Sequence, residues 1–320
     1  MTCALPPETA RSLAAVSRSL VGEWGLTPDP DEDWGRSSHV VPVRTADGVP
    51  AVLKVATADP GTEHAALALQ HWGGRGAVRL LRADPRRRAV LLERLERRDL
   101  TQEWDVHACE AVADLHRLLH VPAPPQLQPL TEHVGRHVEP LAALPRDAPL
   151  PRRMVEQCLA HLRDLGADAA STGTLVHGDL HYENVLADTT GEWVAVAPRA
   201  LSGDPHWEPA PLLWNRLEEA EGDVRRTVRV RFETVVDAAG LDEDRARAWA
   251  VVRLVLNAFW SVRSERPDPA YVTRMLTVLK AAMPKAAMPK PALQPGPTAR
   301  PTRGTAVNSR DRHRACGRRH

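Results

Sequence analysis

Lysine and asparagine are scarce in this chain of 320 residues, although 26% of the residues are charged. Lysine occurs only at positions 54, 280, 285 and 290, so Lys54 is the only lysine in the first 279 residues. Nearly all other basic residues are arginine, and a GC-rich genome explains most of that excess. Under so strong a bias, a retained lysine indicates a need for lysine itself. The same reasoning draws attention to Asn184, one of the asparagines at 184, 215, 257 and 308.

Paired cysteines, long apolar runs and an excess of charge of one sign are also lacking. The four cysteines, at positions 3, 109, 158 and 316, show no C-x-x-C spacing, which argues against a disulfide framework or a zinc site and fits a reducing cytoplasm. No segment reaches the roughly 18–20 apolar residues of a membrane span, and the N-terminus shows no signal peptide. With a net charge of +1, we expect no nucleic-acid partner. The sequence therefore predicts a cytoplasmic protein without a membrane partner.

The hydrophobic periodicity divides the chain into a mixed segment, 1–95, and a helical segment, 96–283. In the first segment we expect helices at 8–24 and 62–72 and strands at 39–45, 50–56, 77–83 and 88–95. In the second we expect helices at 102–119, 128–143, 152–165, 222–239, 242–262 and 269–282, interrupted by a β-rich interval at 174–196. This order indicates an α+β protein of two lobes, with the cleft between them as the natural ligand site.

The C-terminal segment has a different composition. The five residues Ala-Ala-Met-Pro-Lys at 281–285 are repeated directly at 286–290, and residues rich in Pro, Arg, Thr and Gly follow. We expect residues 284–320 to form a disordered, solvated, basic and Pro-rich tail, because nothing apolar accompanies its arginine cluster.

The stretch His177-Gly-Asp-Leu-His-Tyr-Glu-Asn184 carries the strongest chemical signal. Phosphoryl transfer needs a carboxylate beside the attacking hydroxyl and an amide oxygen on a magnesium ion. A loop that enters a short strand can direct Asp179 and Asn184, five residues apart, to one point. Taken alone, Asp179 would also suit a turn after Gly178.

The two histidines of this stretch leave a different chemistry open. His177 and His181 are four residues apart, so a zinc hydrolase built on them and Asp179 is conceivable. The stretch lacks the glutamate of an H-E-x-x-H motif and has no third ligand nearby. Hydrogen bonding within the loop is therefore the simpler role for both histidines.

Lys54 lies in the Val-rich run Val49-Pro-Ala-Val-Leu-Lys-Val55, directly after a predicted hairpin. Strand alternation points its side chain away from those of Leu53 and Val55. In a nucleotide cleft its ammonium group would meet the α- and β-phosphates; otherwise it is an exposed strand lysine. Glu63, in the next predicted helix, is the candidate to brace this lysine, although the phase of that helix leaves the partner open.

Two further regions are assigned to the nucleotide side. Gly35-Arg-Ser-Ser38 precedes the first Val-rich strand, and Ser37 and Ser38 could lie over phosphates, although the run is too short for a glycine-loop fingerprint. Glu93 ends the predicted sheet, where backbone groups of the connecting segment could bind an adenine base. The charge of Glu93 would not be needed for that contact.

Five motifs together resemble the aminoglycoside phosphotransferase family, in its streptomycin 6-phosphotransferase and hydroxyurea phosphotransferase branch. They lie in the family's order at 52–55, 72–80, 120–125, 177–184 and 203–205, and the resemblance extends over most of residues 10–280. It implies a protein-kinase-like fold, with a five-stranded N-lobe and a helical C-lobe. It also implies ATP, Mg²⁺ and transfer of the γ-phosphoryl group to a hydroxyl of a small antibiotic.

Carried over by position, the resemblance assigns Lys54 to the phosphates, Asp179 to the acceptor hydroxyl and Asn184 to a metal ion. One position departs from the family, because Val196-Ala197-Pro198 stands where relatives have an apolar residue followed by Asp-Pro. Loss of a charged metal ligand would raise the barrier by on the order of 4 kcal/mol or more. We therefore expect either a phosphotransferase with impaired activity or a non-catalytic protein of the same fold that binds nucleotide or a small molecule.

The acceptor is expected against the C-lobe. Streptomycin-like acceptors carry guanidinium groups and therefore require carboxylates. Trp207 and Glu208 follow the segment around Ala197, where the family binds metal, and should line the acceptor side. Glu218 and Glu219 fit a solvated helix face. Hydroxyurea is neutral and would not need these charges. We expect a monomer whose partner is a small-molecule acceptor.

Overall fold

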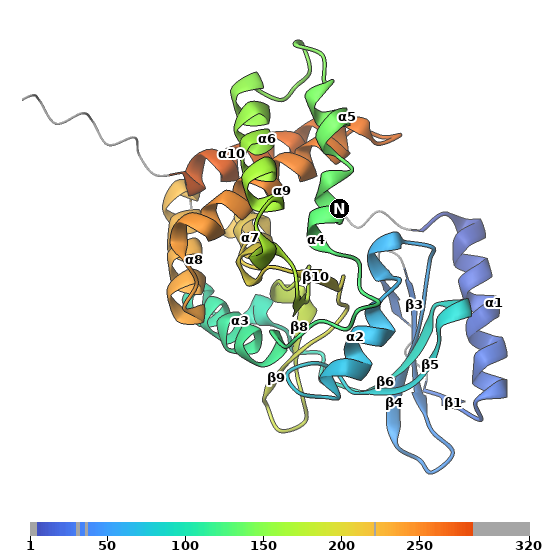
Figure 1. Ribbon diagram of the computed structural model, residues 1–320. Helices are drawn as coiled ribbons and strands as arrows, with labels where there is room; N and C mark the ends of the chain where they lie inside the picture. The colour runs from blue at the N-terminus through green and yellow to red at the C-terminus, as the bar shows by residue number, and fades with distance from the viewer. Residues whose placement is uncertain (1–4, 30–32, 36–37, 221, 284–320) are drawn as a thin grey trace, which may run out of the picture. The chain divides into compact units, whose positions relative to one another are not determined.

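The computed structural model describes residues 5–29, 33–35, 38–220 and 222–283, which belong to one compact unit (Figure 1). Ser37 and the predicted tail at 284–320 lie outside the described residues.

An antiparallel sheet occupies the N-terminal part of the fold, in the strand order β1-β3-β4-β6-β5 with β2 paired to β3. Its strands are β1 (Thr27–Pro28), β2 (Asp33–Gly35), β3 (Ser38–Arg44), β4 (Pro50–Ala56), β5 (Leu80–Asp84) and β6 (Ala89–Glu93). β3 and β4 form the expected hairpin, and its turn holds Gly48 at a φ of 82°. Among the described residues the sheet has six strands, one more than the resemblance implies, because the short β2 pairs with the start of β3.

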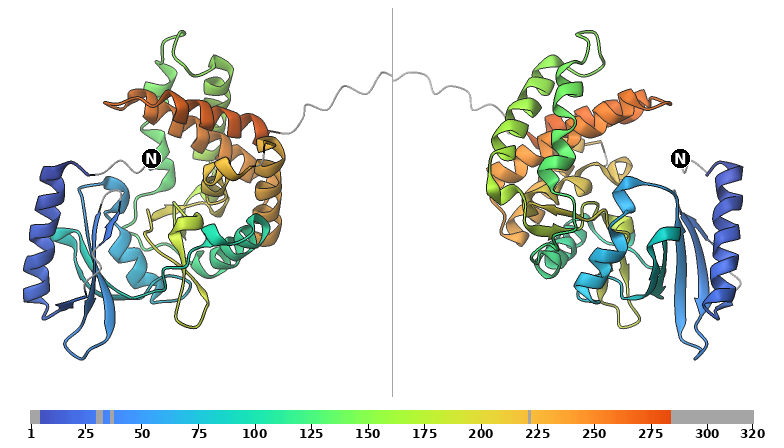
Figure 2. Two further views of the ribbon diagram at one scale, coloured as in Figure 1. Left: turned by 180° about the vertical axis from the view of Figure 1, so that it is seen from behind. Right: turned by 45° about the vertical axis from the view of Figure 1, so that its right-hand side comes forward.

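Burial along β4 decides which way Lys54 points. Leu53 and Val55 are buried in a core that they share with Leu20 of α1 (Pro7–Glu23). Because side chains alternate along a strand, Lys54 points to the opposite face of the sheet. Figure 2 shows α1 against the outer face and α2 (Ala65–Trp72) on the inner face, toward the remaining helices.

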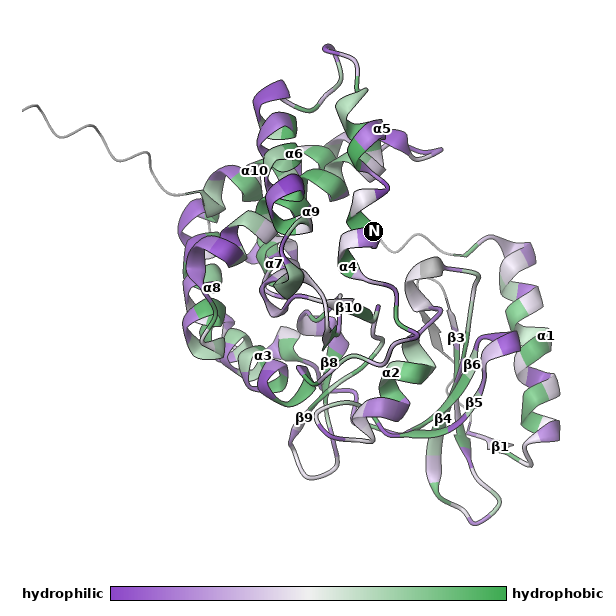
Figure 3. Ribbon diagram, in the orientation of Figure 1, coloured by the Kyte–Doolittle hydropathy of each residue, from purple (hydrophilic) through white to green (hydrophobic). Residues whose placement is uncertain are grey.

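The remainder of the described chain is mainly helical. Its helices are α3 (Asp105–Leu119), α4 (Leu130–Gly135), α5 (Val138–Ala142), α6 (Arg152–Gly166), α7 (Ala210–Trp214), α8 (Val224–Ala239), α9 (Glu243–Arg263) and α10 (Pro269–Ala282). α9 is buried along most of its length and contacts α6, α8 and α10. Figure 3 shows hydrophobic residues along one side of α1 and α8 and hydrophilic residues along the other, as expected for helices that pack on a core by one face. No helix in the described part of the chain is long and apolar enough to cross a membrane.

The single helix expected at 128–143 is in fact two short helices, α4 and α5. Pro140 lies in the first turn of α5, where a proline is tolerated because its missing N–H has no partner there. A helix that continued from α4 through residue 140 would lose a hydrogen bond and meet a steric clash at this proline. The chain therefore breaks at Arg136 and His137.

Two small sheets position the 177–184 stretch. β7 (Thr174–Val176) pairs with β10 (Leu201–Gly203), and β8 (Val185–Ala187) pairs with β9 (Trp193–Ala195). The loop leaves β7 and enters β8 through a 3₁₀ turn at Tyr182–Asn184, while the segment 196–200 connects β9 to β10. These pairings bring the loop at 177–184, hereafter the catalytic-type loop, side by side with the segment at 196–200, which contains Ala197.

Candidate active site

Gly178 allows the loop at 177–184 to lie directly against the segment at 196–200. Its φ is +79°, and an added Cβ would lie 2.2 Å from the backbone oxygen of Arg199, so no other residue fits without a backbone shift. Two hydrogen bonds fasten the contact: the Arg199 N–H donates to the His177 oxygen at 2.8 Å, and His177 Nε2 lies 3.0 Å from the Val196 oxygen.

His177 holds the loop together as a neutral ring. It is fully buried, and burial lowers its pKa to about 3. Its Nδ1 accepts from the Asp179 N–H at 3.3 Å, which leaves Nε2 to donate to Val196. Among the described residues, only one group of three side chains lies close enough together to hold a metal ion, namely His116, His120 and Glu208. None of His177, His181 and Asp179 belongs to it. The zinc alternative therefore gains no support.

A side-chain to backbone hydrogen bond holds Asp179 and Asn184 close together in the loop. Asn184 Nδ2 donates to the Asp179 backbone oxygen at 2.7 Å and lies 3.1 Å from His181 Nε2. This arrangement leaves the amide oxygen of Asn184 as a potential metal ligand. The Asp179 carboxylate is 28% exposed and faces two guanidinium groups, with Arg199 Nε at 3.5 Å and Arg253 Nη2 at 3.9 Å.

Lys54 and Ala197 line the same two cavities from opposite lobes. One cavity is also lined by Glu63 and Pro198, and the other by Leu186 and Val196. Within the described residues Lys54 forms no hydrogen bond or ion pair, and burial together with the charge of Arg199 lowers its pKa. An unpaired, half-buried ammonium group at a cavity wall is suited to an anionic ligand.

Glu63 is exposed and lines the Lys54 cavity, but it forms no ion pair with this lysine in the described part of the chain. Glu93 also lines a cavity, yet its carboxylate accepts from the Arg79 N–H at 2.7 Å and so links β6 to the start of β5. Ser38 is buried within β3. None of the three therefore presents its side chain as an obvious phosphate ligand.

Ala197 has a backbone conformation unusual for alanine. Its φ is +57°, in the left-handed region where Asp and Asn are several-fold more common than other non-glycine residues. The local backbone therefore suits the aspartate that the family resemblance leads us to expect here. As the site stands, Asn184 offers an oxygen of the type that Mg²⁺ prefers, and Ala197 offers none. The residues fit one weakly held ion and do not fit a pair of ions bridged by a carboxylate.

Glu208 does not lie on the acceptor side, contrary to expectation. It is fully buried, and its two carboxylate oxygens accept from the backbone N–H groups of Gly178 at 2.7 Å and His177 at 3.1 Å. Burial raises its pKa to about 7, and His116 Nε2 lies 3.7 Å away. A carboxylate so placed orders the loop backbone and cannot reach an acceptor. The sequence could not distinguish this buried glutamate from an exposed one that binds the acceptor, because either would stand at this position after residues 196–198.

A further cavity beside the loop is the candidate acceptor pocket. It is lined by Trp207, Arg136, Arg199, Arg253, His133, His137 and Trp260, together with Asp59 and Glu63. Trp207 borders this pocket, with only 2% of the residue exposed. Burial lowers the pKa of His133 to about 4, so this ring is neutral at physiological pH. The pocket walls are aromatic and cationic, with few carboxylates.

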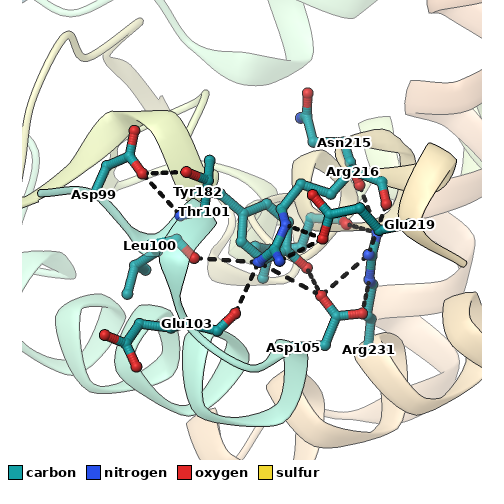
Figure 4. Close-up of polar contacts among 11 residues, drawn as sticks. Asp99, Leu100, Thr101, Glu103, Asp105, Tyr182, Asn215, Arg216, Glu219 and Arg231 are labelled. Atoms are coloured by element: carbon teal, nitrogen blue, oxygen red, sulfur yellow. Dashed lines mark hydrogen bonds and ion pairs between the residues drawn. The ribbon is translucent and has the colours of Figure 1, made fainter.

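A partly buried polar network beneath the loop was not expected from the sequence (Figure 4). Tyr182 donates to Asp105 Oδ1 at 3.1 Å, and Arg231 binds the same carboxylate through Nε at 2.8 Å and Nη2 at 3.1 Å. The guanidinium groups of Arg216 and Arg231 lie 4.8 and 5.3 Å from the Tyr182 ring centroid. Only Arg231 could have been noticed in the sequence, because it lies on the apolar face of α8 and a core position seldom holds a charge without a partner.

Comparison with known proteins places these features in context. Residues 23–264 match the sequence model of a family described as aminoglycoside/hydroxyurea antibiotic resistance kinase. The chain is 38% identical over 271 residues to a streptomycin 6-kinase of Streptomyces glaucescens, covering 82% of this chain and 88% of the relative. It is 36% identical over 289 residues to a hydroxyurea phosphotransferase of Kitasatospora aureofaciens, covering 87% and 81%. These matches confirm the resemblance drawn from the motifs.

Solved structures show the same fold at low identity. An aminoglycoside phosphotransferase in ternary complex with ADP and hygromycin B aligns with a TM-score of 0.58 at 17% identity, covering 85% of this chain and all (100%) of that chain. A choline kinase from Streptococcus pneumoniae aligns with a TM-score of 0.58 at 14% identity, covering 85% and 99%. The α+β, protein-kinase-like architecture expected from the sequence is thereby confirmed.

Proposed function

The chain belongs to the aminoglycoside/hydroxyurea antibiotic resistance kinase family, whose members are phosphotransferases, and we propose that it transfers the γ-phosphoryl group of ATP to a hydroxyl of a small antibiotic. The acceptor is of the streptomycin or hydroxyurea type. The proposal rests on one observation: Lys54 of the sheet and Ala197 line the same two cavities. The catalytic-type loop is hydrogen-bonded to the segment that contains Ala197. A triphosphate in this cleft would lie between Lys54 and the pair Asp179 and Asn184.

Each step of the transfer has a residue suited to it. The acceptor oxygen forms a bond to the γ-phosphorus as the bond from that phosphorus to the bridging oxygen breaks, and ADP leaves. The hydroxyl proton passes to the Asp179 carboxylate. Lys54 pairs with the α- and β-phosphates. Asn184 would hold a magnesium ion, which supplies charge neutralisation when bound.

Ala197 supports a second candidate function. Without a carboxylate at this position the site has less charge with which to hold metal on the triphosphate, so turnover would be slow or absent. The same fold would then bind nucleotide or antibiotic without transfer. This alternative keeps the ligand contacts of Lys54 and loses only the chemical step.

Release of ADP from Mg-ATP tests both functions. The full chain is assayed with streptomycin, a second aminoglycoside and hydroxyurea, beside an Asp179→Ala variant. The transferase proposal predicts acceptor-dependent ADP release above this control. Nucleotide binding without such release would support the non-catalytic function, and absence of both would reject the nucleotide site itself.

A further inference from the structure

Arg199 places a permanent positive charge where the two lobes meet. Its Nη2 donates to Asp59 Oδ2 at 2.8 Å, and its Nε lies 3.5 Å from Asp179 Oδ2. Asp59 belongs to the connection that follows β4, and Asp179 to the catalytic-type loop. One guanidinium group therefore spans from the nucleotide lobe to the residue that faces the acceptor.

Gly61 lies directly against the Arg199 side chain. A Cβ added to Gly61 would lie 2.3 Å from Arg199 Nη1. The positive charge of Arg199 also contributes to the lowered pKa of Lys54. With 43% of its side chain exposed, Arg199 lines the candidate acceptor pocket, next to the segment whose Ala197 lines the Lys54 cavities.

The other arginine near Asp179 is already fully engaged. Arg253 is 7% exposed, donates to the backbone oxygens of Gly178 and Trp207, and stacks over the Trp207 ring at 4.5 Å. In contrast, the pair between Arg199 and Asp59 is partly exposed, and such pairs contribute little to stability. Arg199 can therefore exchange Asp59 for a stronger anion at small cost.

We propose that the Arg199 guanidinium binds the γ-phosphate of ATP and supplies there the positive charge that a metal ion held by an aspartate at position 197 would otherwise supply. This inference rests on the proposed function, since it requires a triphosphate in the cleft. Arginine is suited to the task, because its planar fork matches phosphate oxygens and remains charged at any physiological pH. Arginine fingers in other phosphoryl-transfer enzymes neutralise the same developing charge.

Calorimetric titration of the full chain with ATP and with ADP, each with Mg²⁺ and with EDTA, tests the inference. Arg199→Gln should weaken ATP binding by about tenfold or more and ADP binding by less than about threefold, because only ATP has the γ-phosphate. Arg199→Lys should retain part of the difference. Arg229→Gln, which removes an exposed ion pair with Glu233 on α8 outside these cavities, is the matched control and should bind both nucleotides as the wild type does.

Asp59→Asn gives a test in the opposite direction. Freeing Arg199 from its partner should strengthen ATP binding by about two- to fivefold, in line with the small worth of an exposed pair. In the double variant Arg199→Gln/Ala197→Asp, the lost ATP affinity should return and depend on Mg²⁺.

The outcomes separate this inference from the function on which it rests. If the wild type binds neither nucleotide, the proposed function fails and the inference fails with it. If the wild type binds ATP and Arg199→Gln leaves the ratio of ATP to ADP affinity unchanged, the inference alone is rejected. A gain in ATP affinity in Arg199→Gln would also reject it, since Arg199 would then act as a restraint on Asp179.

Discussion

Position 197 shows how one side chain can be missing from a site whose backbone remains suited to it. Its φ of +57° costs an alanine about 1 kcal/mol or more, and Asp or Asn offsets part of that cost by local hydrogen bonding. Flanking backbone hydrogen bonds hold the conformation, since the Val196 N–H donates to the Asn184 backbone oxygen at 2.9 Å and the Arg199 N–H to the His177 backbone oxygen at 2.8 Å. An aspartate should therefore enter without rearrangement.

We predict that Ala197→Asp raises kcat for acceptor-dependent ADP release by about a hundredfold or more, because it restores a charged metal ligand. The measurement is a steady-state assay over a range of Mg²⁺ concentrations, in which the variant should also depend more steeply on the metal. Ala197→Asn is the matched control, since it suits the same backbone but brings no charge. Equal rates in all three proteins would mean that position 197 lies outside the metal site.

At the scale of elements, local patterns predicted most of the fold but only part of the site. α1, α3, α6, α8, α9 and α10 lie where their apolar periodicity places them, since each packs on the core by a long face. β10 and α7 were missed because elements of three and five residues are too short to show a period. The loop pair Asp179 and Asn184 was visible as a motif, whereas the burial of Glu208 depends on a contact with residues about thirty positions earlier.

The catalytic-type loop rests on α3 and α8 through the network of Tyr182, Asp105 and Arg231. We predict that Arg231→Met lowers the free energy of unfolding by about 2–3 kcal/mol. The cost stays below that of a fully buried pair, because Asp105 is 32% exposed and can still be hydrated. Chemical denaturation gives the value, and turnover should fall with it as the loop loosens.

Arg225→Met, on the exposed side of the same helix, serves as the control for this variant. It should change stability by no more than about 0.5 kcal/mol. Equal effects of the two substitutions would show that the network does not support the loop.

For the whole molecule, the site depends on two lobes that no local pattern places relative to each other. Lys54 comes from the sheet, while Asp179, Asn184 and Ala197 come from the segments that connect the strands of the two small sheets. Arg199 joins the two through Asp59, which is 140 residues away in sequence. Such a contact has no signature in composition or periodicity, so only the structure could identify it.

The buried histidines make the whole fold sensitive to acid. Burial lowers the pKa of His120 to about 4, and it also lowers the pKa values of His116, His133 and His177. The unfolded chain binds protons at these groups below pH 6.5 while the folded chain does not, so stability falls as pH decreases. Glu208 has the opposite effect on the pH dependence of stability. Because its pKa is raised to about 7, the folded chain binds a proton there that the unfolded chain has lost, and the free energy of unfolding falls as pH rises toward about 7.

We predict that His120→Gln reduces the loss of unfolding free energy between pH 6.5 and pH 5 by about 1.5 kcal/mol relative to the wild type. Denaturant titrations at a series of pH values give this slope. His107→Gln, at an exposed position of α3, the helix that ends directly before His120, is the matched control. A wild-type stability that is flat across this range would contradict the assignment of neutral buried rings.

A crystal structure of the full chain with Mg²⁺ and the non-hydrolysable ATP analogue AMP-PNP tests the central claim most directly. The account predicts a triphosphate in the cleft, with Lys54 on its α- and β-phosphates, Arg199 on its γ-phosphate in place of Asp59, and the Asn184 amide oxygen turned toward a single metal ion. A nucleotide bound away from Lys54 and the 177–184 loop, or a cleft that stays empty at saturating AMP-PNP, would contradict it.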